Sequence, residues 1–520
     1  MRKRILMFIC GILASLPIVF PKIGFLQWVL LIPFALLCLS EGDSNGKKHF
    51  RQEYTCGFLF FFGYYLVCYS WFLSMYPLSV TGMPKIAALG IVLLAWVGIP
   101  LFQSLGFALI FPLIRYAFRR GLPKWLLPIF SGALWSIGEW VQNFFWFGLP
   151  WVKLALGQVD INELYRSANL FGSYFVTFLI VSVNFYLAVS FKETVKKRKC
   201  AMAVTSLIIF LANALYGIID LHIASEKSYD TVRISAFQGN ISTQEKWSSY
   251  MLDRSFEIYE RLAEEASEAG ADYAILPETV IPYVTEDFSD IDSSLRDIAW
   301  KNNITLMVGT FGKVGDGTGN IIRVYEPMRE GVNVYTKQKP VPFGEYVPMR
   351  DLIMTVLPVL GEINMLDRSL IPGEDSTVWQ SDDATFGYLI CFDSIYDYAA
   401  RKSVKNGADL LLISTNDSWF GDSAGTRMHS SQAKLRAVEN GRSVVRAANT
   451  GISSIITPLG EIVALIPVGE EGQITADVPI TNDLTLYTRI GNLFVYICIV
   501  FKVISFISIK FRNKITVRSS

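Results

Sequence analysis

The chain has 520 residues, of which 52% are apolar and 18% are charged, whereas a soluble protein carries about a quarter charged residues. Its 47 basic and 46 acidic residues leave a net charge of +1, which excludes an intrinsically disordered chain and gives no support for a basic nucleic-acid-binding protein. Seven cysteines are too few for a small disulfide-stapled secreted domain. A mean hydropathy of +0.36 predicts that part of the chain lies in a lipid bilayer.

Mostly apolar runs long enough for membrane-spanning helices occur eight times, at 5–20, 24–40, 54–76, 86–116, 125–147, 167–190, 201–220 and 491–509. The first run follows Met1-Arg-Lys-Arg4, as in a cleaved signal peptide, but no small-residue cleavage site precedes the second run. We therefore expect a retained helix there. The sequence predicts seven membrane helices in residues 1–220, and an eighth helix with a basic tail in residues 486–520.

The basic residues between these runs predict the orientation of the chain. If it starts in the cytoplasm and crosses eight times, the cytoplasmic segments hold nineteen Lys and Arg residues, and the opposite short loops hold four, Lys22, Lys85, Lys153 and Arg166. Cytoplasmic loops are enriched in Lys and Arg. We therefore expect both termini in the cytoplasm and residues 221–485 on the outer face of the membrane.

Residues 221–485 show short apolar runs alternating with polar stretches of helical spacing. Strands are expected at 231–237, 273–276, 305–308, 321–325, 332–335, 386–390, 410–413, 443–448 and 453–457, and helices at 250–269 and 431–442. This pattern indicates an α/β domain. Gly315-Asp-Gly-Thr-Gly319 lacks the Lys-Ser/Thr of a phosphate-binding loop, and we expect a hairpin turn there.

Four of the expected strands run directly into polar or reactive residues. These are Glu278 after Leu276, Lys337 after Tyr335, Cys391 after Ile390, and Ser414-Thr-Asn-Asp-Ser-Trp-Phe420 after Ile413. Side chains that do chemistry in α/β folds gather beyond the carboxyl ends of the strands. We therefore expect these residues to meet in one site.

Cys391 is the only cysteine in the outer domain, so it has no partner there for a disulfide. It is either a buried structural residue or a nucleophile, and a nucleophile needs a base and a group that stabilises the oxyanion. His429 is one candidate base, as in a Cys–His protease, but an ordinary surface or groove position suits it better. Glu278 fits the role of base, and Lys337 could stabilise the thiolate and the oxyanion.

Glu, Lys and Cys at successive strand ends resemble the nitrilase superfamily, and the chain is more similar still to its membrane-bound branch, the apolipoprotein N-acyltransferase family. The segments that carry the resemblance are Phe237-Gln-Gly-Asn-Ile241 with Lys246-Trp247, Leu276-Pro-Glu-Thr279, Lys337 with Val341-Pro-Phe-Gly-Glu-Tyr-Val-Pro348, Ile390-Cys-Phe-Asp393, Asn416-Asp-Ser-Trp-Phe-Gly-Asp422, Arg436-Ala-Val-Glu-Asn-Gly-Arg442 and Gly148-Leu-Pro-Trp151. Two segments depart from the family pattern. Cys391-Phe-Asp393 replaces Cys-Tyr-Glu, and Arg489-Ile-Gly-Asn492 replaces Arg-x-Gly-Asp.

The resemblance implies eight membrane helices beside a nitrilase-like α-β-β-α sandwich in a bacterial cytoplasmic (inner) membrane, with the sandwich on the periplasmic or extracytoplasmic face. It implies transfer of a fatty acyl chain from a phospholipid such as phosphatidylethanolamine, through a Cys391 thioester, to the α-amine of a diacylglyceryl-cysteine at the N-terminus of an apolipoprotein. Glu278 would be the general base, and Lys337 would stabilise the charged intermediate. The supporting residues would be Glu345, Phe392, Asp393, Trp247, Asn416 and Trp419. No cofactor, metal or nucleic acid is implied, and a monomer in the lipid bilayer is expected.

Two other functions stay open at this point. One is a membrane-tethered amidase or hydrolase of the nitrilase type, or an acyltransferase with another amine acceptor. The other is a receptor or transporter with an outer sensor domain, although binding alone does not require a thiol.

Two features of the sequence allow more than one interpretation. Residues 351–366 contain repeated apolar pairs and are either a core helix or an apolar arm that enters the bilayer or covers a lipid channel. Glu139 lies inside the fifth apolar run, between Trp135 and Trp140. An acid there marks either a functional site or a hydrogen bond between helices.

Overall fold

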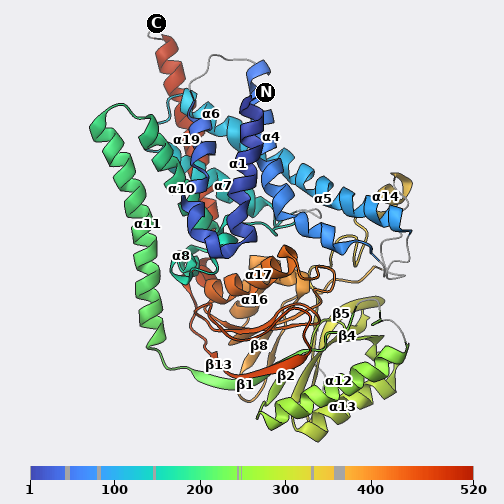
Figure 1. Cartoon of the computed structure of the whole chain (residues 1–520). Helices are drawn as coiled ribbons and strands as arrows, with labels where there is room; N and C mark the ends of the chain where they lie inside the picture. The colour runs from blue at the N-terminus through green and yellow to red at the C-terminus, as the bar shows by residue number, and fades with distance from the viewer. Residues whose placement is uncertain are drawn as a thin grey trace.

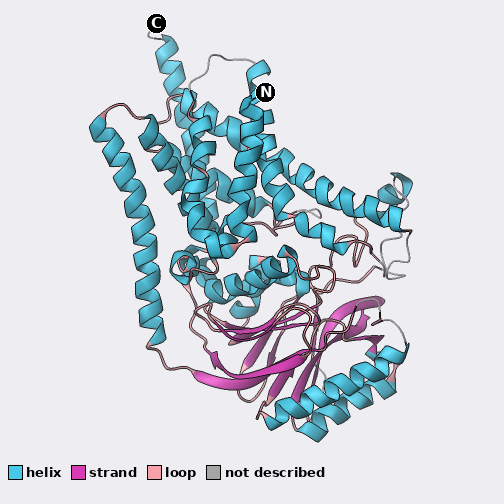
Figure 2. Cartoon of the chain, viewed as in Figure 1, coloured by secondary structure: helices cyan, strands magenta, loops and turns pink. Residues whose placement is uncertain are grey.

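The computed structural model describes residues 2–40, 47–78, 84–144, 148–242, 245–246, 249–329, 333–356 and 369–518. A bundle of helices occupies one end of the molecule and an α/β part the other (Figures 1 and 2). Both ends of the chain lie at the end of the bundle that faces away from the strands (Figure 1).

The helical part is formed by the N-terminal half of the chain and by its C-terminal helices. In chain order these elements are α1 (Arg2–Val19), η1 (Pro21–Leu26), α2 (Gln27–Leu30), α3 (Ile32–Cys38), α4 (Lys47–Cys68), η2 (Ser70–Met75), α5 (Lys85–Phe107), α6 (Ile110–Arg119), α7 (Leu127–Val141), η4 (Leu154–Gln158), α8 (Asn162–Tyr165), α9 (Ala168–Phe171), α10 (Ser173–Lys192), α11 (Lys196–Ser225), α18 (Leu486–Ile490) and α19 (Leu493–Arg518). Helices α1 and α4 pack closely because Gly11 has no side chain. A Cβ there would lie 1.9 Å from the carbonyl oxygen of Phe60.

Five helical stretches in the described residues are long and apolar enough to cross a bilayer, at Pro21–Cys38, Lys85–Arg119, Ser173–Lys192, Lys196–Ser225 and Leu493–Lys510. The other three apolar runs coincide with helices α1, α4 and α7. On α11 the side chains of Leu207, Leu211 and Leu215 are more than half exposed, as expected for a helix that faces lipid. The structure thus has several apolar helices, and the number eight stays a prediction.

The α/β part contains two sheets. Its strands are β1 (Asp230–Gln238), β2 (Tyr273–Ile275), β3 (Ile281–Val284), β4 (Thr305–Val314), β5 (Gly317–Tyr325), β6 (Val334–Thr336), β7 (Val378–Gln380), β8 (Thr385–Ile390), β9 (Leu410–Thr415), β10 (Ser443–Ala448), β11 (Ser453–Ile456), β12 (Ile462–Ile466) and β13 (Gly472–Ile480). In the described residues one sheet has the order β13-β1-β2-β4-β5-β6, with β3 paired to β4, and the other has the order β12-β11-β10-β9-β8-β7.

Helices cover the outer faces of both sheets. The first sheet carries α12 (Ser249–Glu268) and α13 (Ser289–Asn302), whereas α16 (Asp397–Lys405) and α17 (Ala424–Asn440) lie between the second sheet and the helical bundle (Figure 1). Apolar side chains that alternate along the strands, among them Ile234, Phe386 and Leu412, form the core between the sheets. The expected α-β-β-α sandwich is therefore present.

Most strands expected from the sequence are present, and the β4–β5 turn confirms the expected hairpin. Val314 pairs with Gly317, and Gly315 has φ +54°, a conformation that glycine adopts without strain. Helix α17 begins earlier than the expected residue 431. Its N-cap is Ser423, whose side chain accepts a hydrogen bond from the main-chain N–H of Gly425.

The helical bundle and the sandwich share a buried interface joined by hydrogen bonds. Tyr174 donates to Asp397 at 2.8 Å, the main-chain N–H of Ser173 to Glu439 at 2.9 Å, Gln432 to the Trp151 carbonyl at 3.1 Å, and Tyr396 to the Gly148 carbonyl at 3.1 Å. Apolar residues of α16, α17 and the bundle belong to one continuous core. The bundle therefore supports the sandwich directly.

Two features left open by the sequence are partly placed. Glu139 is buried in α7, and its carboxylate accepts hydrogen bonds from Trp135 at 3.2 Å, from the Leu154 main chain at 2.9 Å and from Thr177 of α10 at 2.7 Å. These contacts correspond to one of the two interpretations, a hydrogen bond between helices. In the 351–366 segment, α14 (Arg350–Val356) is a short helix, and the rest of the segment lies outside the described residues.

Candidate active site

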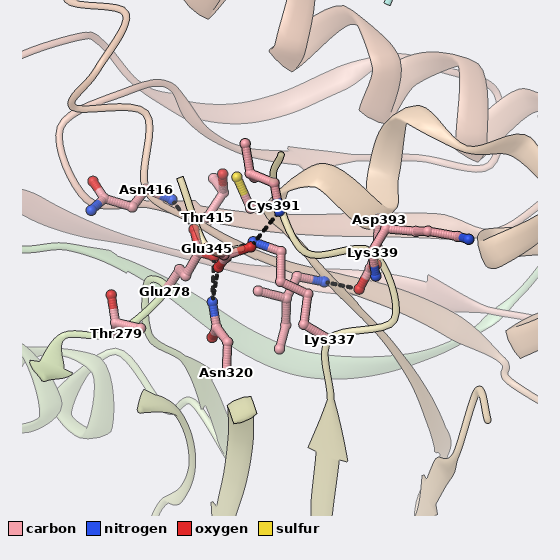
Figure 3. Close-up of polar contacts among 12 residues, drawn as sticks. Glu278, Thr279, Asn320, Lys337, Lys339, Glu345, Cys391, Asp393, Thr415 and Asn416 are labelled. Atoms are coloured by element: carbon pink, nitrogen blue, oxygen red, sulfur yellow. Dashed lines mark hydrogen bonds and ion pairs between the residues drawn. The ribbon is translucent and has the colours of Figure 1, made fainter. Parts of the chain in front are cut away.

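Glu278 and Lys337 meet at the carboxyl ends of two strands in the first sheet. Glu278 follows β2, and Lys337 follows β6. The Lys337 ammonium donates to Oε1 of Glu278 at 2.8 Å and to Oε1 of Glu345 at 2.9 Å (Figure 3). All three side chains are largely buried, so this charged group is shielded from bulk water.

Asn320 of β5 joins the same two carboxylates from the other side. Its Nδ2 donates to Oε1 of Glu278 at 2.7 Å and to Oε1 of Glu345 at 2.9 Å (Figure 3). The remaining oxygens accept from main-chain N–H groups, Oε2 of Glu278 from Asn416 and Oε2 of Glu345 from Val341. Each carboxylate is therefore held on both oxygens, in one orientation.

The second sheet brings Cys391 to this group. Strand β8 ends at Ile390, and Cys391 opens the short helix η6 (Cys391–Ile395) with φ +46°, a left-handed conformation that is rare for a residue with a side chain. The loop that carries Glu278 is tied to the second sheet, because Ser414 donates to the Leu276 carbonyl at 2.8 Å. The strand ends of both sheets thus converge on one point (Figure 3).

Burial and charge set the resting protonation states. Burial raises the pKa of the Cys391 thiol well above its usual range, the Glu278 carboxylate adds to this, and Lys337 and Thr415 oppose it. Burial disfavours the charge of Lys337, but Glu278 and Glu345 outweigh it and hold the pKa of that ammonium well above normal. The resting site therefore holds a neutral thiol beside a charged lysine, and the thiol needs a base when it reacts.

Asp393 lies behind the thiol and holds the loops together. Its carboxylate accepts hydrogen bonds from Tyr335 at 2.9 Å, from the Ile390 main chain at 3.1 Å and from the Lys339 main chain at 2.8 Å. Burial raises the pKa of Asp393 to about 6, although Lys337 opposes this. Asp393 contacts the end of β6 and the turn at Cys391, so its geometry fits a role in support of the nucleophile.

The other residues expected near the site differ in position. The main-chain N–H of Asn416 contacts Glu278, whereas Phe392 is buried against Tyr396 with ring centroids 5.6 Å apart. Trp419 packs near Ala88 and Val92 of α5, on the side of the helical bundle. Trp247 lies outside the described residues.

Two features of this site were not predicted from the sequence. Asn320 is one of its residues, and the feature of the sequence that could have indicated it is a single amide side chain between Gly319 and the apolar end of β5. His429 was expected at the surface or in a groove, but its side chain is 1% exposed. It was misplaced because α17, which carries it, packs between the second sheet and the bundle, an arrangement that only the tertiary structure reveals.

Two family models and several known proteins are similar to this chain. The family model for carbon-nitrogen hydrolases matches residues 233–482, and the model for the apolipoprotein N-acyltransferase N-terminal domain matches residues 10–186. An amidase of the nitrilase superfamily from Nesterenkonia AN1 aligns with a TM-score of 0.40 and 20% identity, over 52% of this chain and 97% of that one. By its family model, the α/β part is a carbon-nitrogen hydrolase domain.

Full-length relatives specify the family. The apolipoprotein N-acyltransferase of Geobacter metallireducens is 28% identical over 96% of this chain and 93% of its own. That of Pasteurella multocida is 30% identical over 70% of this chain and 71% of its own, and that of Shewanella oneidensis is 27% identical over 89% and 88%. This chain belongs to the apolipoprotein N-acyltransferase family.

Proposed function

We propose that this protein transfers a fatty acyl chain from a phospholipid to the α-amine of the N-terminal diacylglyceryl-cysteine of apolipoproteins, through a thioester on Cys391. The observation that carries the proposal is the group of Glu278, Lys337 and Glu345 beside a thiol on a left-handed turn. Family membership supplies the acyl transfer reaction and its acceptor.

In the first half-reaction Glu278 takes the proton of the Cys391 thiol as the sulfur attacks the ester carbonyl of the phospholipid. The ammonium of Lys337 stabilises the negative charge that develops on the carbonyl oxygen. The C–O bond to the glycerol breaks, the alkoxide takes the proton back from Glu278, and a lysophospholipid leaves. The acyl group remains on sulfur as a thioester.

In the second half-reaction the α-amine of the acceptor attacks the thioester carbonyl, and Glu278 accepts a proton from the attacking nitrogen. The C–S bond breaks, the proton passes to the sulfur, and an amide is formed. Water must stay away from the thioester, since hydrolysis would convert the enzyme into a lipase. Burial of the Glu278–Lys337–Glu345 group supports such exclusion.

For the chain in its membrane, we propose an eight-helix topology with both termini in the cytoplasm. Domain boundaries at residues 220 and 485 would place the sandwich on the outer face of a bacterial cytoplasmic membrane. Support comes from the apolar helices, from the position of both chain ends at one end of the bundle, and from the unequal distribution of basic residues. Both substrates are lipid-anchored, so they reach a monomer in the bilayer by lateral diffusion.

The experiment combines the purified protein with a fluorescent phosphatidylethanolamine and a synthetic diacylated lipopeptide. We expect a labelled acyl-enzyme on Cys391, sensitive to hydroxylamine, followed by a triacylated peptide. Cys391→Ser should lose both products. Cys200→Ser, which changes an exposed cysteine far from the site, is the matched control and should retain both.

The same assay distinguishes the alternatives. Release of free fatty acid without peptide product would favour a membrane-tethered hydrolase, and transfer to another added amine would point to a different acceptor. Absence of any labelled Cys391 would refute acyl transfer through the thiol.

A further inference from the structure

His429 lies behind the Cys391 turn with hydrogen-bond partners on both ring nitrogens. Its Nδ1 is 2.8 Å from Oδ1 of Asp417, and its Nε2 is 3.2 Å from the main-chain carbonyl oxygen of Cys391 and 3.1 Å from Oγ of Ser394. These contacts involve the main chain of Cys391, so they do not assign His429 as a base for the sulfur. The ring faces the peptide that follows the nucleophile.

The partners determine where the protons sit on this ring. Asp417 is a carboxylate, since Arg446 holds its pKa well below the usual range despite burial, so Nδ1 must donate. The Ser394 hydroxyl already donates to the Cys391 carbonyl at 2.7 Å, which leaves Nε2 facing two oxygens that accept. Nε2 therefore acts as the donor to the Cys391 carbonyl.

The surroundings of the ring hold it in one orientation. Arg446 donates to the other oxygen of Asp417, and its Nη2 also lies 3.4 Å from Nδ1 of His429. The indole of Trp151 stacks on His429 with centroids 5.3 Å apart and planes 28° apart, and Phe420 meets it edge-on at 5.9 Å. Stacked and edge-on aromatic contacts of this kind fix the plane of the ring.

We propose that His429 is a positioning residue that clamps the carbonyl of Cys391 through Nε2–H and so holds the nucleophile turn in its left-handed conformation. Through Trp151, the helical bundle supports this clamp, because Trp151 contacts Trp71 at 5.0 Å and both rings meet Phe420. The membrane part of the protein thus stabilises the geometry of the thiol. The clamp depends on the proposed function in one respect, because thioester formation is the reaction that it assists.

The sharpest test compares two neutral amide replacements of His429. Glutamine places its Nε2 near the position of the ring Nε2 and can donate to the Cys391 carbonyl. Asparagine reaches only the position of Nδ1, near Asp417. Both are neutral amides, so the difference between them reports the clamp alone.

Two rates are measured in a Cys200→Ser background. One is the single-turnover rate of thioester formation with fluorescent phosphatidylethanolamine. The other is alkylation of Cys391 by iodoacetamide, followed by peptide mass spectrometry, which requires no lipid. We expect His429→Gln to stay within about tenfold of the parent, since the glutamine amide restores the donor. We expect His429→Asn to react about 100-fold slower, because a nucleophile displaced by about 1 Å loses about this much.

A second pair of variants tests the support from the bundle without touching the turn. Trp151→Phe keeps an aromatic face over the ring, whereas Trp151→Leu removes it. We expect the leucine variant to be about tenfold slower than the phenylalanine variant in both rates, because leucine removes the stacked ring that holds His429. Thermal unfolding in detergent checks that each variant is folded. If a His429 variant does not fold, this second pair decides.

The outcomes separate the two proposals. The clamp is supported if His429→Asn reacts more slowly than His429→Gln and if Trp151→Leu reacts more slowly than Trp151→Phe. Equal rates within either folded pair overturn it. If the parent forms no thioester but alkylation still differs within the pairs, the proposed function fails and the clamp stands.

Discussion

The role of Asn320 offers a direct test of the site, because its side chain donates to both carboxylates and is itself uncharged. Asn320→Leu keeps the size of the side chain and removes both donors. Glu278 would retain the Lys337 ammonium and the Asn416 N–H, and Glu345 would retain Lys337 and the Val341 N–H. Each carboxylate therefore loses one of its three partners.

The magnitude follows from these contacts. A hydrogen bond to a charged group contributes about 1.5–3 kcal/mol, so two lost bonds reduce stability by at least about 3 kcal/mol before the gain from burying leucine. The effect on catalysis arises because Oε1 of Glu278 is then held by Lys337 alone, and the carboxylate can turn away from the thiol. We expect thioester formation to slow about 100-fold, the scale of a misplacement of about 1 Å.

The assay pairs urea unfolding in detergent micelles with single-turnover acylation of Cys391. The matched control is Asn333→Leu, an exposed asparagine before β6 that the site does not use. It should leave both quantities at the parent value. A folded Asn320→Leu variant that acylates at the parent rate would refute the argument that Asn320 orients Glu278.

Further predictions concern the support of the same group. In Gly309→Ala a new Cβ would lie 2.3 Å from the Pro277 carbonyl oxygen, so the Glu278 loop must shift and acylation should fall more than about tenfold, whereas Gly472→Ala meets no atom within 4 Å and should be neutral. For Asp393, a raised pKa of about 6 means that the folded protein binds a proton more tightly than the unfolded chain does, so this group's stabilisation falls as pH rises from 4 to 7, by about 3 kcal/mol. The unfolding midpoint of the parent relative to Asp393→Asn should therefore drop over that range, and a constant difference would contradict it. Glu139→Leu removes three hydrogen bonds to the carboxylate inside the bundle, so the free energy of unfolding should fall by about 2 kcal/mol in thermal unfolding. An unchanged free energy of unfolding would show that the carboxylate is not a structural link.

The sequence predicted the structure best where the pattern of a single strand was enough to place a residue. Apolar runs placed β8 and β9, and the residues just beyond them were readable as site candidates because strand ends face the same edge of a sheet. Glu278, Lys337 and Cys391 come from three such ends. The contact of Lys337 with Glu278 is the geometric consequence of that rule.

Contacts between elements distant in the chain were not predictable in the same way. Asn320 reaches the site from the middle of a hairpin, and His429 reaches it from a helix that packs behind the second sheet. Neither position has a local pattern, because each depends on how two sheets and a helical bundle pack. Asn492, where the sequence departs from the family pattern Arg-x-Gly-Asp, is another position whose contacts could not be predicted. Its amide donates to Asp397 at 3.2 Å, a contact that an ionised Asp there could not make, and only the fold reveals this partner.

The charge arrangement of the site favours a nucleophile that forms only when substrate is present. The raised pKa of Cys391 keeps the resting thiol neutral, and Lys337 is already paired with two carboxylates. In the proposed mechanism, the oxyanion that develops from the ester carbonyl would compete with Glu278 for the Lys337 ammonium, and a carboxylate with a weakened ion pair is a better base. Under this proposal, substrate binding and activation of the thiol are coupled through one lysine. Lys337→Met should therefore slow acylation by phospholipid far more than alkylation by iodoacetamide, a reagent that develops no oxyanion, and equal losses in the two rates would argue against this coupling.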